Sequence, residues 1–373
     1  MKTKLIAAAA ALLACSAAQA QTSVTLYGVA DIGLEYLTKA EGTKDNLVRM
    51  SSGNLSGSRW GLRGSEDLGG GLKSVFVLES GFQLDTGDNN RLFGRQAYLG
   101  LQTKAGTVTL GRQQNLLYDF TVNYDPMGAA TRYSLANMDG EMVSRADNAI
   151  KYVGTFGGLT ASALYSFGYG GEGSARVFPY GLVYGPTNVE GEVPGKWRQG
   201  REMSAGLSYA AGQFGVSTVY DHRNPIDSIK EQRATIAGTY TVGPAKLYGG
   251  YRWASLNGGA NSARSNLWWL GAGYNVTSAL SLSGAAYYQD LRSTKADPWL
   301  FVLQADYALS KRTDVYLSMA YALNRTDNNL YWTDSGRNVS SNLRLDDGMK
   351  WWNGLTDSKQ NQFGAVVGIR HRF

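Results

Sequence analysis

The chain has 373 residues, a formal net charge of +6 and a mean hydropathy of −0.27, and its 47 glycines far outnumber its 7 prolines. This mild, dispersed charge without any Lys/Arg-rich run excludes a nucleic-acid-binding protein. Beyond the first 20 residues no apolar run approaches the roughly 18 residues of a membrane helix, so a chain that spans a bilayer must do so with strands.

The N-terminus has the three parts of a secretory signal peptide. Lys2 and Lys4 form the positive end, Leu5 to Ala14 the apolar stretch, and the small residues that end at Ala20 the cleavage site. We expect cleavage between Ala20 and Gln21, which gives a signal peptide of residues 1–20 and a single domain of residues 21–373. A lipoprotein cleavage box that ends at Cys15 is the alternative. Cleavage at Ala20 removes the only cysteine, and the mature chain then has no disulfide and no thiol metal site.

From Thr22 onward, segments of about ten residues alternate apolar and polar side chains, which is typical of strands between two environments. Seven short turns are expected near 67–71, 104–106, 157–158, 211–212, 243–244, 278–279 and 311–313. Eight longer loops are expected near 39–57, 84–92, 114–147, 170–201, 224–230, 258–265, 293–298 and 326–359. These connections join sixteen strands, and the pattern predicts an all-β fold: an antiparallel transmembrane β-barrel with short periplasmic turns and long extracellular loops.

A soluble sandwich or barrel would also alternate, but its interior face would be apolar. Here one face carries apolar and aromatic residues and the other carries Ser, Thr, Gln, Arg and Asp, which could not fill a dry core. The polar face is therefore expected to be wet. The last segment, Gln360 to Phe373, ends on an aromatic residue with nothing after it. We expect this strand to pair with the first one and close the ring, with Phe373 at the closure.

The sequence resembles the Gram-negative general porin family, in the branch typical of β-proteobacteria. The matching stretches begin at Ser23 (SVTLYGVAD), Ser58 (SRWGLRGSEDLGGGL), Phe93 (FGRQAYLGL), Thr109 (TLGRQ) and Gly368 (GIRHRF), and the likeness covers the whole mature chain. The resemblance implies a homotrimer in the outer membrane, a third loop folded into the pore, and passive diffusion of small hydrophilic solutes and ions. It also implies contact with outer-membrane lipid and lipopolysaccharide, and biogenesis through the barrel-assembly machinery.

A barrel of this width needs a constriction lined by fixed charge if it is to be selective. The loop from 114 to 147 supplies the predicted acidic side, in place of the simpler interpretation of an external solvated loop. Its candidate residues are Asp119, Asp125, Asp139 and Glu141. The predicted basic side lies on the barrel wall and comprises Arg59, Arg63, Arg95 and Lys151. Since wall cations outnumber the lumen acids, we expect a weak to moderate preference for anions.

Strand parity gives an outward direction to two further arginines. Arg95 matches a wall position of the family, but it shares its parity with outward Leu99 and Leu101, unless a bulge intervenes. Arg112 shares its parity with Val108 and Leu110, so we expect it to point outward, at a subunit contact. Further lumen-facing cations are expected from parity alone: Lys73, Arg233, Lys246, Arg252 and Arg370.

Enzymatic function is not expected, because His222 and His371 are the only histidines and no catalytic or metal-binding motif is present. A membrane-embedded hydrolase with an Asp/His site is the enzymatic alternative, and we expect neither cofactor nor metal. The stronger rival is a solute-specific channel or an adhesin on the same barrel. Its support is the aromatic content of the loops 170–201 and 326–359, where Trp197, Trp332 and Trp351 could bind a ligand.

Overall fold

The computed structural model describes residues 23–40, 44–89, 91–169, 176–177, 183–184, 192, 194–224, 229–258, 261–292, 297–325, 330–331, 339–340, 343–345 and 360–373. The predicted signal peptide, with its cleavage at Ala20 and Gln21, lies outside these residues, as do most of the loops 170–201 and 326–359. Among the described residues, no helix has the length and apolar character to cross a membrane.

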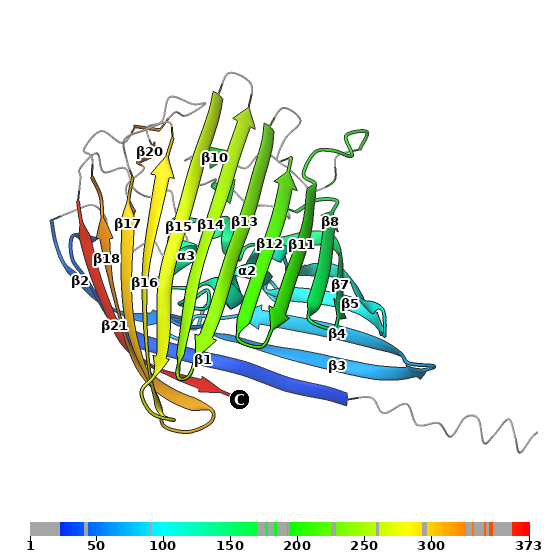
Figure 1. Ribbon diagram of the computed structural model, residues 1–373, viewed down its shortest axis with the longest axis horizontal. Coiled ribbons are helices and arrows are strands. Elements are labelled where there is room, and N and C mark those ends of the chain that lie inside the picture. The colour runs from blue at the N-terminus through cyan, green and yellow to red at the C-terminus, as the bar shows by residue number, and fades with distance from the viewer. Residues whose placement is uncertain are drawn as a thin grey trace, which may run out of the picture.

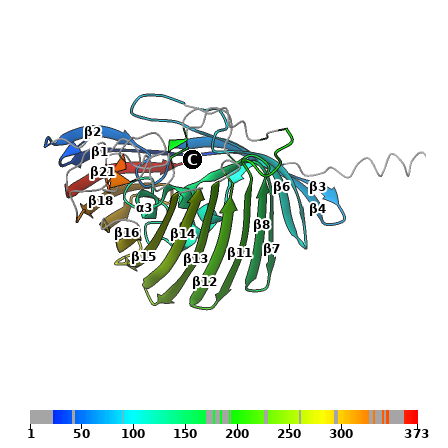
Figure 2. The same cartoon turned by 90° about the horizontal axis from the view of Figure 1, so that it is seen from above.

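Sixteen antiparallel strands form one closed ring in the described part of the chain (Figures 1 and 2). The first eight are β1 (Ser23–Leu37), β3 (Arg59–Gly69), β4 (Leu72–Gly81), β5 (Gln96–Thr103), β6 (Gly106–Gln114), β7 (Arg145–Phe156), β8 (Leu159–Ser166) and β11 (Glu202–Ala211). The second eight are β12 (Phe214–Arg223), β13 (Ile229–Val242), β14 (Ala245–Gly258), β15 (Asn261–Asn275), β16 (Leu280–Leu291), β17 (Trp299–Ala308), β18 (Thr313–Leu323) and β21 (Gln362–Arg372). The predicted barrel is confirmed.

In the described part of the chain, five shorter strands and three helical segments lie outside this ring. Strand β2 (Leu47–Ser52) pairs with the loop-side half of β1. The two-residue strands β9 (Arg176–Val177) and β10 (Val183–Tyr184) pair with each other, and so do β19 (Leu330–Tyr331) and β20 (Val339–Ser340). The helical segments α2 (Leu116–Tyr124), α3 (Leu135–Met138) and η2 (Gly140–Val143) all belong to the connection between β6 and β7.

The ring closes between the first and last strands, as predicted. β1 pairs with β3 along its first half and with β21 along its second half. Gly28 and Phe373 exchange two backbone hydrogen bonds, of 3.0 and 3.1 Å, at the end of that seam. The Phe373 ring lies against Gly28, because a Cβ atom at residue 28 would come within 2.2 Å of the ring. Since lipid offers no hydrogen-bond partners, this seam removes the last free sheet edge.

Short turns connect the strands at one end of the barrel and longer loops at the other, as predicted. The connection between β7 and β8 consists of Gly157 and Gly158 alone, and Gly157 has a φ of +62°. Two-residue hairpins require such left-handed backbone, which glycine adopts at no steric cost. Glycine at these turns therefore allows the tight periplasmic end.

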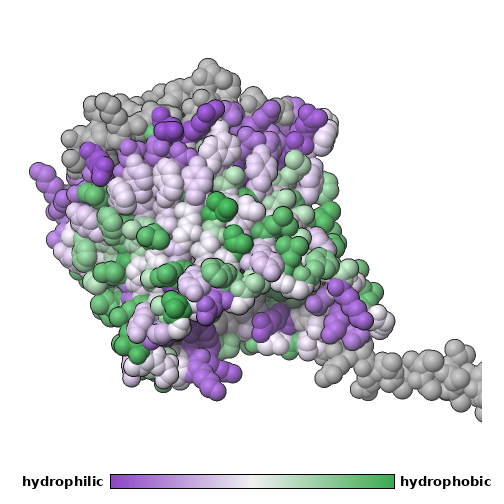
Figure 3. Space-filling model, in the orientation of Figure 1, coloured by the Kyte–Doolittle hydropathy of each residue, from purple (hydrophilic) through white to green (hydrophobic). Residues whose placement is uncertain are grey.

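The two faces of the strands differ as the alternation predicts. Outward residues such as Leu26 and Leu270 are 60% and 70% exposed, whereas inward Glu35 and Arg252 are fully buried inside the barrel. Figure 3 shows apolar side chains in a band across the strands, with hydrophilic side chains above and below it. An exposed apolar band of this kind requires lipid as its solvent.

One part of the interior departs from the prediction that the inward face is wet. Leu267, Trp269, Tyr287, Leu300 and Val302 point inward from β15, β16 and β17, and they are buried in an apolar cluster. The physical reason is the segment between β6 and β7, whose own apolar residues cover this part of the wall. The barrel thus has a dry core on one side and an open lumen on the other.

Closure of the seam can be tested at Gly28. We expect Gly28→Val to lower the stability of the folded barrel by about 1–3 kcal/mol, because the new side chain must displace the Phe373 ring or the Arg59 carbonyl oxygen. Urea unfolding in detergent micelles, followed by the heat-dependent gel shift of folded barrels, measures the loss. The matched control is Gly249→Val on the outer face of β14, where the nearest atom to the new Cβ lies 3.7 Å away. Equal losses in both variants would contradict the role of this contact.

Candidate functional site

The connection between β6 and β7, residues 115–144, folds into the barrel instead of extending from it. We call this segment loop 3, since it is the third of the long connections. Figure 1 shows α2 and α3 inside the wall, and Figure 2 shows α3 enclosed by the ring. Local hydrogen bonds cap the N-termini of both helices. The Asn115 side chain accepts from the Tyr118 amide at 2.9 Å at the start of α2, and Ser134 and Asn137 form a capping box at the start of α3. The predicted folded-in loop is therefore present.

Loop 3 packs its apolar side chains on β15 and β16. The Phe120 ring meets the Trp269 ring edge-on at 6.1 Å, and the Trp269 Nε1 donates to the Tyr124 carbonyl oxygen at 2.9 Å. Pro126 sits against Gly271, where a Cβ atom would come within 2.4 Å of the proline ring. The absence of a side chain at Gly271 thus allows the loop to reach the wall.

Three fully buried arginines of the wall, Arg223, Arg233 and Arg252, hold the far end of loop 3. Asp139 lies 3.0 Å from the Nε atoms of both Arg233 and Arg252, and Glu141 pairs with Arg223. A buried guanidinium requires a counter-charge, because desolvation costs several kcal/mol per ion. The wall and the loop therefore satisfy each other's charges.

Two further acids of loop 3 also turn toward the wall. Asp119 pairs with Lys151 of β7, and the Lys151 ammonium also donates to the Gln114 carbonyl oxygen at 3.1 Å. Asp125 is buried and accepts from the Tyr287 hydroxyl at 2.5 Å and from the Ala129 amide at 3.0 Å. Burial raises the pKa of the Asp125 carboxyl to about 6.

The four acids predicted at the constriction thus serve as anchors in the structure. None of them lines the large cavity on the opposite side of loop 3. Lys151, predicted on the basic side of the constriction, is neutralised by Asp119 and does not line that cavity either. The reason is that the inward faces of β7 and β12 to β14 carry cations that need partners, and loop 3 brings the nearest carboxylates.

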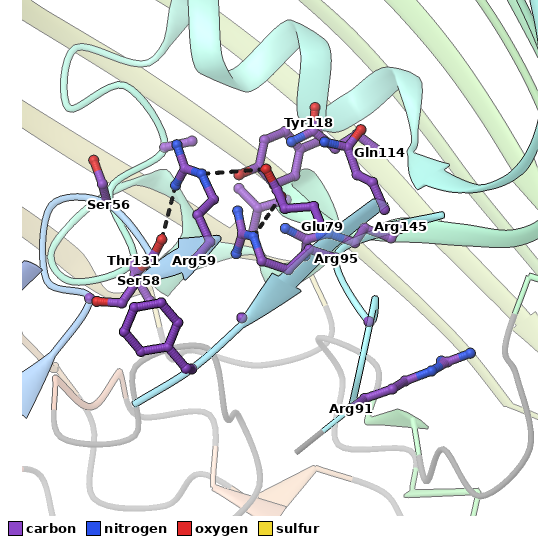
Figure 4. Close-up of a pocket in the computed structure, with 18 of the residues that line it drawn as sticks. Ser56, Ser58, Arg59, Glu79, Arg91, Arg95, Gln114, Tyr118, Thr131 and Arg145 are labelled. Atoms are coloured by element: carbon purple, nitrogen blue, oxygen red, sulfur yellow. Dashed lines mark hydrogen bonds and ion pairs between the residues drawn. The ribbon is translucent and has the colours of Figure 1, made fainter. Parts of the chain in front are cut away.

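The large cavity lies between loop 3 and the inner wall of β1 and β3 to β7, and its volume is about 1020 Å³ (Figure 4). Six arginines line it: Arg59, Arg63, Arg91, Arg95, Arg112 and Arg145. Its lining contains two acids, Glu79 and Asp88. Such an excess of fixed cations in a low-dielectric enclosure concentrates anions.

Glu79 on β4 organises part of this arginine cluster. Its carboxylate lies 2.7 Å from the Arg95 Nε and 3.5 Å from the Arg59 Nε, and it accepts from the Tyr27 hydroxyl at 3.0 Å. Asp147, behind the cavity lining, pairs with Arg112 at 2.5 Å and with Arg91 at 3.7 Å. Carboxylates therefore fix four of the six guanidiniums in place without cancelling their total charge.

Arg63 and Arg145 are held by aromatic rings instead. The Arg63 guanidinium lies over the Tyr27 ring at 5.2 Å, and the Arg145 guanidinium lies over the Tyr118 ring of α2 at the same distance. Neither has a carboxylate within ion-pair distance among the described residues. Cation–π contacts position a guanidinium without neutralising it, so these two cations contribute full charge to the cavity.

Sequence reasoning placed Arg59, Arg63 and Arg95 at this wall, and the structure brings all three together. The parity objection to Arg95 does not apply, because Arg95 precedes β5 and its side chain is not aimed by the strand. The prediction that Arg112 points outward is wrong. The register shifts between Gly111 and Gln113, where Gly111 has a φ of +130°, and this bulge turns Arg112 toward the cavity.

Arg91 and Arg145 were missed by the sequence analysis. Arg145 is the first residue of β7, and the register shift between β6 and β7 separates it from Lys151, so alternation gives no signal for it. Arg91 lies in a loop, where alternation gives no signal. No group of three or more His, Cys, Asp or Glu side chains within the described residues is placed to hold a metal ion.

Comparison with known proteins gives a consistent picture. Residues 7–328 match the family described as Gram-negative porin. An outer membrane porin protein of Bordetella pertussis is 31% identical, and outer membrane porin protein 32 of Delftia acidovorans is 30% identical, each over the whole of both chains. The solved structure of an anion-selective porin from Comamonas acidovorans superposes with a TM-score of 0.76 at 24% identity, over 95% of this chain and all of that one. The trimer form of OmpT from Vibrio cholerae has a TM-score of 0.63 at 16% identity, with 94% and 99% coverage.

The anchoring of loop 3 can be tested at Asp139. We expect Asp139→Asn to weaken the docking of loop 3 by about 3–5 kcal/mol, because Arg233 and Arg252 lose their shared carboxylate in a buried place. Single-channel recording in a planar bilayer should show larger and noisier currents. The matched control is Asp88→Asn, an exposed acid of the cavity lining, which should leave the noise unchanged. A quiet channel in the Asp139 variant would refute the anchoring role.

The pH dependence of loop docking follows from Asp125. Its folded-state pKa of about 6 lies above the ordinary value of 3.8, so the folded protein favours the protonated form. This stabilisation is fully present below pH 3.8 and is lost as the pH rises through about 6, and it amounts to about 3 kcal/mol. Melting temperatures of wild type and Asp125→Asn, measured from pH 3 to 8, should therefore diverge across this window. Parallel curves would show that the carboxyl titrates normally.

Proposed function

The chain belongs to the Gram-negative porin family and forms an outer-membrane channel for passive diffusion, and we propose that this channel prefers anions. The observation that carries the proposal is the cavity beside loop 3, with six arginines and two acids in its lining. Porins of this fold are channels without catalytic activity. The solutes are small hydrophilic molecules and ions, and the fixed cations raise the local concentration of those that are negative.

The arrangement of the loop-3 acids strengthens this proposal. A transverse field between wall cations and loop acids would favour neither sign strongly. In this chain Asp139, Glu141 and Asp119 are each paired with a cation of the wall, and none of them lines the arginine-lined cavity. The cavity therefore presents mainly one sign of charge. The neighbour described as anion-selective has the same fold, and it supports the proposal by likeness.

We extend the proposal to assembly and biogenesis. The protein is proposed to work as a homotrimer, supported by the trimer form of the OmpT neighbour. Removal of residues 1–20, folding through the barrel-assembly machinery, and contact with membrane lipid and lipopolysaccharide complete this proposal. Its support is the predicted signal at the N-terminus and the apolar outer band of the barrel.

Reversal potential in a salt gradient across a planar bilayer tests the anion preference. We expect the double variant Arg63→Gln, Arg145→Gln to reduce the anion-to-cation permeability ratio at least roughly twofold, because these two cations have no neutralising carboxylate. Glu79→Gln should raise the ratio, since it removes an acid from the cavity lining.

The control for this experiment is Arg292→Gln, which removes one positive charge from an exposed side chain at the end of β16, outside the lumen. Its permeability ratio should equal that of the wild type. A wild-type channel that prefers cations would overturn the proposal. Conductance that saturates with one solute, instead of rising in proportion to salt, would favour a solute-specific channel.

A further inference from the structure

Helix α2 of loop 3 presents two different sides to the lumen. Tyr118 and Val122, which are four residues apart and therefore on one side of the helix, line the arginine-lined cavity. Asp119 and Asn123, on the neighbouring side, line a second cavity of about 390 Å³ between α2 and the wall of β7, β8 and β11 to β14. The apolar side of α2 thus faces the arginines, and its polar side faces the second cavity.

Val122 is an exposed apolar residue inside the barrel. It exposes 44% of its surface in the cavity, whereas Leu117 and Phe120 of the same helix are buried. An apolar side chain in contact with water lacks the free energy that burial would give it. A solute with an apolar part therefore gains free energy when it covers Val122.

The opposite wall of the cavity has an apolar strip beside a cation. Arg63 of β3 lies directly opposite Val77 of β4, and Val77 lies directly opposite Tyr98 of β5. All three residues line the cavity, and the Cβ atoms of directly opposed residues are about 5 Å apart. Val77 and Tyr98 are partly exposed. A guanidinium therefore borders an apolar and an aromatic side chain on the same face of the sheet.

The cations next to these apolar side chains keep their full charge. Arg63 lies over the Tyr27 ring, and Arg145 lies over the ring of Tyr118, which reaches from α2 toward the wall (Figure 4). In the described part of the chain, no carboxylate lies within ion-pair distance of either guanidinium. A guanidinium binds a carboxylate through two parallel hydrogen bonds, so both residues can bind a carboxylate solute.

Both walls of the cavity therefore combine a cation with apolar side chains. A hydrophilic anion gains only from the cations. An anion whose carboxylate is attached to an apolar group gains from both, because its apolar part covers Val122 or Val77 while its carboxylate binds a guanidinium. The volume of about 1020 Å³ leaves room for such a solute, since pockets of roughly 300–1,000 Å³ hold much larger ligands than one aromatic ring.

We propose that the channel favours amphiphilic carboxylates, in which one carboxylate is attached to an aromatic or branched apolar group, over hydrophilic carboxylates. The carboxylate binds Arg63 or Arg145. The apolar group lies against Val122 of loop 3 or against the strip of Val77 and Tyr98. This preference rests on the anion selectivity proposed above, and it adds the class of anion that gains most from the cavity.

Reversal potentials of the purified full-length channel in a planar bilayer, measured with potassium benzoate and potassium glycerate, test this preference. Benzoate is an aromatic carboxylate, whereas glycerate is smaller and hydrophilic, so sieving by size alone would favour glycerate. We expect the permeability of wild type to be at least about twofold higher for benzoate, because only benzoate covers the apolar side chains. Benzoate should also lower the current in potassium chloride more than the same concentration of glycerate does, because an ion that binds more strongly leaves more slowly.

The variant Val77→Thr, Val122→Thr replaces both apolar contacts with side chains of similar shape and keeps all six arginines. Its benzoate-to-glycerate permeability ratio should fall at least about twofold, because a hydroxyl group covered by an aromatic ring loses its hydrogen bond to water. The matched control is Val153→Thr, the same substitution at an inward-facing valine of β7 that lines the second cavity. Its ratio should equal that of the wild type. The heat-dependent gel shift verifies that each variant is folded.

Reversal potentials in potassium chloride separate this proposal from the proposed function. A channel that prefers chloride to potassium but is equally permeable to benzoate and glycerate would overturn the preference for amphiphilic carboxylates and leave the anion selectivity intact. A wild-type ratio that persists in the Val77/Val122 variant would also overturn it, since the preference would then arise elsewhere in the pore. A channel that prefers potassium would overturn the proposed function, and this preference with it.

Discussion

The structure depends on one constraint: within lipid, every backbone amide and carbonyl group must find its partner in the protein. A sheet satisfies this only when it closes, and here closure rests on β1, whose two halves pair with β3 and β21. The last strand must pair with the first, and at the end of this seam Phe373 packs on Gly28. Closure also separates an outer surface that faces lipid from an inner surface that faces the lumen. Successive residues of each strand lie alternately on these two surfaces.

The interior surface is divided by loop 3. On one side, the loop covers the wall of β12 to β16 and uses its carboxylates to neutralise Arg223, Arg233 and Arg252. On the other side, among the described residues loop 3 brings no carboxylate to the six arginines that line the cavity, and Glu79 and Asp147 of the wall pair with four of them. The same residue type thus has two roles, and the position of loop 3 decides which one applies. Anchoring and selectivity are consequences of a single packing arrangement.

Much of the fold could be predicted from the sequence, because alternation, glycine turns and strand count are local properties. The ring, the short and long connections and the folded-in loop all follow from them or from family likeness. The partners of individual charges are not local. Asp139 meets Arg233 across 94 positions, and nothing in its neighbourhood predicts this. We predicted the wrong face for Arg112, because the bulge at Gly111 interrupts the alternation of inward and outward side chains along β6.

Net charge is therefore a poor guide to what such a barrel conducts. The whole chain has an excess of six basic residues, but Arg233 and Arg252 are neutralised inside the wall, and Arg292 is exposed outside the lumen. What acts on a solute is the smaller set whose side chains reach the cavity and lack a carboxylate. Arg63 and Arg145 belong to that set because aromatic rings, not acids, hold them. An aromatic ring holds a guanidinium in place without neutralising it. The positive charge of these two arginines therefore remains to attract anions, which supports the proposed anion preference.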